Sequence, residues 1–87
     1  NMESANVTLQ NARANKVDAE KNLRIAKERE KRLLSLENTG AVPHLDLLTA
    51  QQQVAQASQQ LTTADTQIAD AQNQIVTLEK EMQAQQE

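Results

Sequence analysis

Few residues of this 87-residue chain could carry chemistry, and those few do not converge. The single histidine, His44, has no cysteine to join it and no pair of acids at metal-ligand spacing, which is typical of an exposed loop histidine. Asp46 lies nearby, but a place in the first turn of a helix, at the positive end of the dipole, accounts for it. Asp65 and Asp70 are five residues apart on one helix and do not converge. We therefore expect no enzyme activity, no metal site and no cofactor.

The composition suits an elongated coiled coil better than a compact domain. There is no aromatic residue and no cysteine, and many of the hydrophobic residues, 38% of the total, are alanines. A compact domain of this size needs larger apolar side chains, or disulfides and metals in their place. The sequence has no run of about 18 apolar residues that could span a membrane. It also shows no signal peptide, so we expect any export signal to lie outside this segment.

Apolar residues recur in alternating steps of three and four along both halves of the chain. Such steps average about 3.5 residues and keep the apolar positions on one side of a supercoiled helix. In the first half, Lys16 and Glu30 interrupt the series, and both side chains can lay their methylenes along it. We call these positions the seam: Met2, Ala5, Leu9, Ala12, Lys16, Ala19, Leu23, Ala26, Glu30 and Leu33, then Leu47, Ala50, Val54, Ala57, Leu61, Ala64, Ile68, Ala71, Ile75, Leu78 and Met82.

A helix stop separates the two halves. Gly40 suits a left-handed residue after a helix, and Pro43 suits the first turn of the next helix. The sequence predicts helices over about 3–37 and about 44–84, joined by a tip at 38–43. Because the connection is short, the helices should run antiparallel as one all-α coiled-coil hairpin over 1–87.

The register of this hairpin follows from side-chain volume. Facing residues whose numbers sum to 80 set one large residue against one alanine in almost every layer. Leu23 then faces Ala57, and Ala19 faces Leu61. A pair of chains that exchange their second helices is an open alternative, because so short a hinge can also lead to swapping.

Charge is distributed unevenly along the chain. Residues 1–44 carry eight Lys or Arg against six Asp or Glu, whereas residues 45–87 carry only Lys80 against six acids. The basic run over 21–32 could suggest nucleic acid, but glutamates are interleaved with it. This pattern favours a solvated helix face with intrahelical ion pairs. No aromatic residue is available to stack on single-stranded bases.

Apolar residues also gather around the turn, off the seam. Some of them are expected to cover the turn, but five exceed what two helix ends need, and an exposed apolar cluster at the end of a rod usually marks a protein contact. Both termini should lie at the other end, so we expect a fragment of a longer chain, inserted between two halves of a larger domain. The five residues are Leu34, Leu36, Val42, Leu45 and Leu48.

The residues of the turn resemble those of a known family. The stretches Arg32-Leu33-Leu34-Ser35-Leu36, Thr39-Gly40-Ala41-Val42-Pro43 and Leu47-Leu48-Thr49-Ala50 are similar to the α-hairpin tip of periplasmic adaptors, or membrane fusion proteins, of type I secretion and tripartite efflux systems. The family's tip carries an Arg, a Leu four residues later and a Ser seven residues after that. Arg32 and Leu36 match the first two, and Pro43 replaces the serine. A proline there resembles the haemolysin-secretion branch, which works with ABC transporters. The likeness covers the whole chain as architecture and 32–50 as motif.

This resemblance implies a structural role in the periplasm. The parent chain would be anchored in the bacterial inner membrane, and the hairpin would connect an inner-membrane transporter to a TolC-like outer-membrane channel beside neighbouring adaptor subunits. Arg32 would form charge-assisted hydrogen bonds and Leu36 would be the apolar anchor. We expect no nucleic acid and no small-molecule substrate. The alternatives are a generic coiled-coil spacer or scaffold and a hairpin that binds nucleic acid through its basic face. The docking residues implied are Arg32, Leu36, Val42, Pro43 and Leu45.

Overall fold

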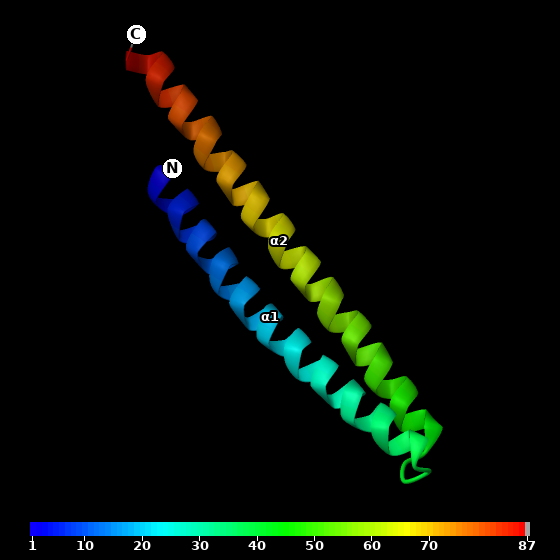
Figure 1. Ribbon diagram of the computed structural model, residues 1–87. Coiled ribbons are helices and arrows are strands. Elements are labelled where there is room, and N and C mark those ends of the chain that lie inside the picture. Colours follow the sequence, from blue (N-terminus) through cyan, green and yellow to red (C-terminus); the bar gives the residue numbers. More distant parts are fainter. Residues whose placement is uncertain (87) are drawn as a thin grey trace.

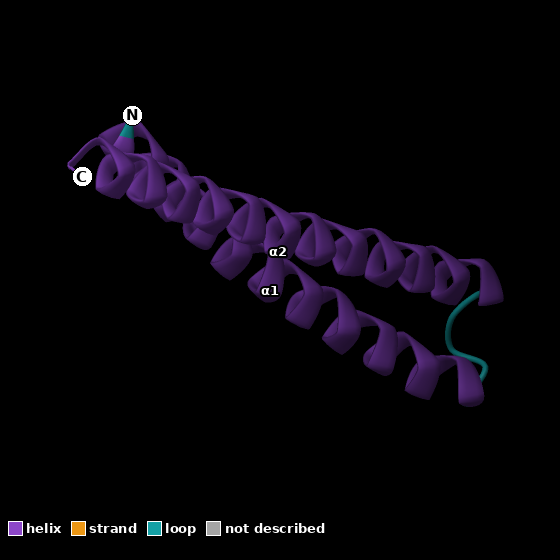
Figure 2. Ribbon diagram, turned by 90° about the horizontal axis from the view of Figure 1, so that it is seen from above, coloured by secondary structure: helices purple, strands orange, loops and turns teal. Residues whose placement is uncertain are grey.

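The chain forms two long helices that run antiparallel and join in a tight turn (Figures 1 and 2). A computed structural model describes residues 1–86, in which α1 spans Met2–Asn38 and α2 spans His44–Gln86. The molecule is a rod of 72 × 14 × 13 Å with the turn at one end and both termini toward the other. No strand occurs within these 86 residues. The all-α antiparallel hairpin is confirmed, and each helix end lies within two residues of its expected position.

Hydrogen bonds at the end of α1 explain why the helix stops there. Gly40 has a φ of 76°, in the left-handed region, and its N–H donates to the Glu37 carbonyl at 2.8 Å. The N–H of Ala41 donates to the Leu36 carbonyl at 3.0 Å. This pair of bonds is the Schellman motif, which satisfies carbonyls that the helix would otherwise leave without partners. Thr39 adds its hydroxyl to the Leu36 carbonyl at 2.7 Å.

The sequence suggested that Pro43 would lie in the first turn of α2, but it lies one residue before the helix begins. Its carbonyl accepts the N–H of Asp46 at 3.1 Å, so the first turn closes on Pro43. Proline fits here because its missing N–H falls where a helix has no partner for one. The side chain of Asp46 is exposed in the first turn of α2, where it opposes the positive end of the dipole.

Alanines form the buried line between the helices. Three alanines of α1 and four of α2 are almost fully buried, and all are seam positions. The larger seam residues are mostly half-buried, so each keeps part of its side chain in water. Among the described residues, Leu47 next to the turn is the one large side chain that is buried, and Met82 is half exposed. The buried alanines are Ala5, Ala12, Ala19, Ala50, Ala57, Ala64 and Ala71.

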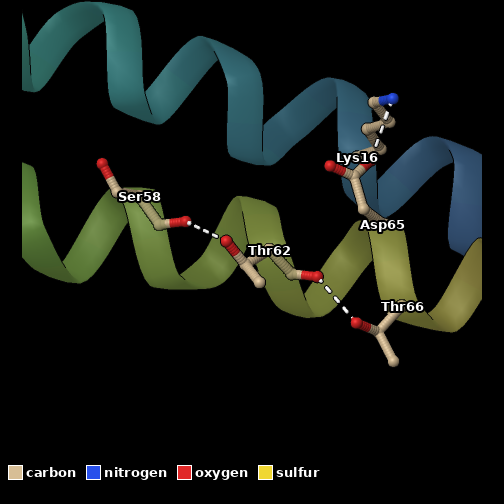
Figure 3. A network of polar contacts seen from close by, with 5 residues as sticks. All are labelled: Lys16, Ser58, Thr62, Asp65 and Thr66. Carbon is tan, nitrogen blue, oxygen red and sulfur yellow. Dashed lines mark hydrogen bonds and ion pairs between the residues drawn. The ribbon is translucent and has the colours of Figure 1, made fainter.

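One ion pair connects the two helices near the middle of the rod. Lys16 Nζ lies 2.9 Å from Asp65 Oδ1 (Figure 3). In the expected register Lys16 faces Ala64, and its observed partner Asp65 is the next residue. A long lysine side chain reaches several residues along the other helix, so the layers of one large residue against one alanine stay a prediction. Leu23 and Leu61 line one groove, whereas Ala19 and Ala64 line another. Lys16 is half-buried at a seam position, while its charge reaches the rim of the interface, as its long side chain allows.

Candidate docking site at the hairpin tip

Four leucines near the turn remain largely exposed, and we call them the tip leucines. Their exposed fractions are 47% for Leu34, 44% for Leu36, 70% for Leu45 and 47% for Leu48. Leu34 and Leu36 belong to the last turns of α1, and the other two belong to the first turns of α2. Packing over the turn therefore does not bury these four side chains. Exposed large apolar residues concentrated at one end of a rod are typical of a contact surface.

Val42 differs from the tip leucines because it is half-buried in the connection. It follows Ala41, whose N–H closes the Schellman motif, and an apolar contact across the turn commonly accompanies this motif. Of the five apolar residues around the turn, Val42 is the least exposed. Pro43 is exposed beside it. The structure thus divides the predicted docking residues into one that is half-buried and others that face water.

Arg32 and Leu36 lie one helical turn apart on the outside of α1. Together with Glu28, Lys31 and Ser35 they line a shallow open groove formed by α1 alone. The lining combines an apolar anchor with two cations, so it could hold an apolar side chain with a carboxylate or carbonyl close to it. Leu45 belongs to α2, and it does not line this groove.

A polar contact across the turn was not expected from the sequence. His44 Nδ1 lies 2.7 Å from Glu37 Oε1, and since a carboxylate accepts, the Nδ1–H of His44 donates. The His44 ring is 67% exposed, whereas Glu37 is only 27% exposed and its Oε2 is buried without a hydrogen-bond partner. His44 is thus the first residue of α2 and a partner of Glu37, rather than a free loop histidine. The contact ties the last turn of α1 to the first turn of α2.

The signal for Glu37 was present in the seam itself. After Leu33, the next step of four residues reaches position 37, just as an earlier step reaches Glu30. Both glutamates are half-buried, as a seam position requires. The series appeared to end at Leu33 because the next seam position, Glu37, is charged and is the last one before the turn. The partner of Glu37, His44, could not be identified without the path of the turn.

The two long faces of the hairpin differ in chemistry. Residues such as Asn15 and Asn22, which precede seam positions of α1, face one side with glutamines and threonines of α2, in grooves that no Lys or Arg lines. We call this side the amide face. Residues that follow seam positions face the other side, where Arg24, Lys27 and Lys31 surround Leu23 and Leu61. We call this side the basic face. Glu20 and Glu28 also line its groove.

The expected intrahelical ion pairs of the basic run do not form. Within residues 1–86, the ion pairs are Lys16–Asp65 and His44–Glu37. The hydrogen bond that Lys16 donates to Asp65, and then the negative charge of Asp65, raise the pKa of Lys16 above its ordinary value of 10.5. The cations between 21 and 32 extend into water instead, because a flexible exposed side chain loses about as much entropy as the pair returns. The solvated face is as expected, and its ion pairs are not.

Residues 1–86 hold no group of three or more His, Asp or Glu placed to bind a metal ion. Neither of the two helices, over the described residues, has a stretch apolar enough to cross a membrane. Comparison with known protein families, with curated proteins and with solved structures found no match to this chain.

Proposed function

We propose that this hairpin is the coiled-coil segment of a periplasmic adaptor and that its turn docks onto a TolC-like outer-membrane channel. The observation that carries the proposal is the group of tip leucines, which stay 44–70% exposed at the closed end of the rod. Leaving that much apolar surface in water at one place is unfavourable unless a partner covers it. The proposal also draws on the family resemblance around Arg32, Leu36 and Pro43.

The shape and charge of the rod are consistent with this role. At 72 Å, the hairpin can hold a docking tip far from the domains that flank it. Leu36 would insert into the channel's helical end while Arg32 meets carbonyl or carboxylate oxygens beside it. The amide face would then be available to neighbouring adaptor subunits, and an inner-membrane transporter would be reached through other parts of the parent chain.

Site-specific photo-crosslinking in cells tests the docking of the tip. A crosslinker placed at Leu36 or Leu45 of the parent protein should capture the outer-membrane channel. The matched control is Val7, which is 50% exposed on the same helix as Leu36 but near the opposite end of the rod. Capture from Val7 alone, or from none of the three, would contradict the docking proposal and favour a generic spacer.

Nucleic-acid binding is the second candidate, because the cations of the basic run have no ion-pair partners within residues 1–86. A helix face that presents Arg24, Lys27 and Lys31 could contact phosphates. Affinity for duplex DNA or RNA should then fall steeply with salt, and replacing these three residues by alanine should remove it. Absence of a salt-dependent mobility shift at low ionic strength excludes this candidate.

A further inference from the structure

A second apolar line runs along α2 beside its seam. Its five members recur every seven residues, which is two turns of a supercoiled helix, so they lie on one line about 42 Å long. All five are exposed, and the two large residues at its ends, Leu48 and Val76, are 47% and 46% exposed. We call this line the outer stripe: Leu48, Ala55, Thr62, Ala69 and Val76.

Thr62, in the middle of the outer stripe, fits an apolar contact. Its hydroxyl donates to the carbonyl of Ser58 at 3.2 Å, within its own helix (Figure 3). The hydroxyl is therefore satisfied without a partner from outside, and covering Thr62 would leave no unpaired donor. A partner can thus cover the whole outer stripe without leaving the Thr62 hydroxyl without a hydrogen-bond acceptor.

The outer stripe has the same pattern in both directions from Thr62. Leu48 and Val76 are each fourteen residues from it, and Ala55 and Ala69 are each seven residues from it. If a second α2 lies antiparallel on the stripe, with a twofold axis at Thr62, each large end residue meets a large end residue and each alanine meets an alanine. A self-complementary patch of this kind is what a twofold dimer requires. The alanines between the ends allow the two helices to approach closely.

Charge selects the antiparallel arrangement. Residues 21–32 of α1 hold six Lys or Arg and two Glu, a net charge of +4, toward the turn. Residues 65–81 of α2, toward the open end, hold four Asp or Glu and Lys80, a net charge of −3. The part of α2 nearer the turn, over 47–64, holds no charged residue. Glu79 and Asp65 follow Val76 and Thr62 by three residues, on the stripe's side of α2, and Asp65 also pairs with Lys16 of its own hairpin. Asp70 lines the amide face instead. An antiparallel copy brings this acidic half beside the basic half of the first hairpin, whereas a parallel copy brings like charges together.

We propose that two copies of this chain associate through the outer stripe of α2, antiparallel, with the twofold axis at Thr62. The inference goes beyond the proposed function and does not rest on it, since the contact lies along the shaft and sends the two tips in opposite directions. Of the tip leucines, only Leu48 belongs to this contact; Leu36 and the groove that it shares with Arg32 do not.

Two threonines provide a matched pair of variants. Thr62 and Thr66 are both exposed, and each donates its hydroxyl to the carbonyl four residues earlier, at 3.2 and 3.1 Å. Only Thr62 lies on the outer stripe (Figure 3). Thr62→Arg places two guanidinium groups together at the axis and should weaken dimerisation at least about tenfold in sedimentation equilibrium, because burying like charges is costly. Thr66→Arg should leave the dissociation constant unchanged. A wild-type chain that stays monomeric, or equal effects of both variants, overturns the proposal.

Cysteine crosslinking tests the geometry without relying on stability. The chain has no cysteine of its own. Under mild oxidation, Thr62→Cys should form a disulfide-linked dimer, because residues at the axis meet their own copies at disulfide distance. Ala55→Cys and Ala69→Cys should each fail to link alone and should link when mixed. Self-linking of Ala55→Cys at a rate similar to Thr62→Cys would show a parallel arrangement, and absence of any link from Thr62→Cys would exclude the axis.

Discussion

Replacing Leu36 by aspartate should abolish docking while leaving the hairpin folded. Leu36 is 44% exposed and lies off the seam, so its removal opens no layer between the helices. Its backbone carbonyl, which accepts bonds from Thr39 and Ala41, is unchanged by the substitution. The remaining cost to folding is an acid in the last turn of α1 and part of an apolar contact, together about 1 kcal/mol. Truncating a central anchor of an interface costs about 2 kcal/mol or more, roughly a thirtyfold loss of affinity.

The controls separate docking from folding. Leu36→Lys removes the same leucine but places a favourable charge at the helix end, so it should lose docking and keep its melting temperature. Leu61→Asp puts a carboxylate into the seam and should cost about 3 kcal/mol or more, melting the rod. Arg32→Ala should weaken docking less than either Leu36 variant, because a rim charge mainly affects encounter and orientation.

The assay combines export activity of the parent protein in cells with thermal circular dichroism of this 87-residue chain. Normal export by both Leu36 variants would refute the docking role of the tip. If Leu36→Asp instead unfolds the chain as Leu61→Asp does, Leu36 belongs to the packing of the turn.

Four smaller predictions concern the turn and the seam, and each is measured as a change in melting temperature. Gly40→Ala should destabilise the hairpin by about 1 kcal/mol, because a side chain disfavours the left-handed backbone although an added Cβ would meet no atom within 4 Å; no change would show that the turn relaxes. Lys16→Leu should raise the melting temperature by completing the apolar seam of α1, and a lower melting temperature would show that the ion pair with Asp65 contributes more. Since the pKa of Lys16 is raised, the wild-type ion pair should stabilise below pH 10.5 and fade as the pH rises further. His44→Ala should destabilise by about 1 kcal/mol by leaving half-buried Glu37 unpaired, and adding Glu37→Leu should restore the loss; a double variant no more stable than His44→Ala would refute this explanation.

Periodicity was enough to predict the hairpin because the same spacing rule holds at every seam position of a regular helix. Steps of three and four residues place one apolar line on each helix, and the stop at Gly40 leaves antiparallel pairing as the compact solution. The seam series also places Lys16 at the interface, where it meets Asp65 of the other helix, while the pairing of each large residue with an alanine stays a prediction. Glu37 was missed because no apolar seam position follows it before the turn, whereas Lys16 and Glu30 have apolar seam positions on both sides.

The state of the tip could not be predicted in the same way, because it depends on the path of a short irregular segment. Val42 and Leu45 are both apolar, both off the seam and only three residues apart, yet one is half-buried and the other 70% exposed. The left-handed Gly40 turns the chain back over the end of α1, so that Val42 reaches the turn while Leu45 has already begun α2. Sequence spacing predicts the direction of a side chain only within a regular helix or strand, and Val42 and Leu45 do not lie in the same one. The same limit applies to the basic run, where the spacing allowed ion pairs and side-chain entropy in water decided against them.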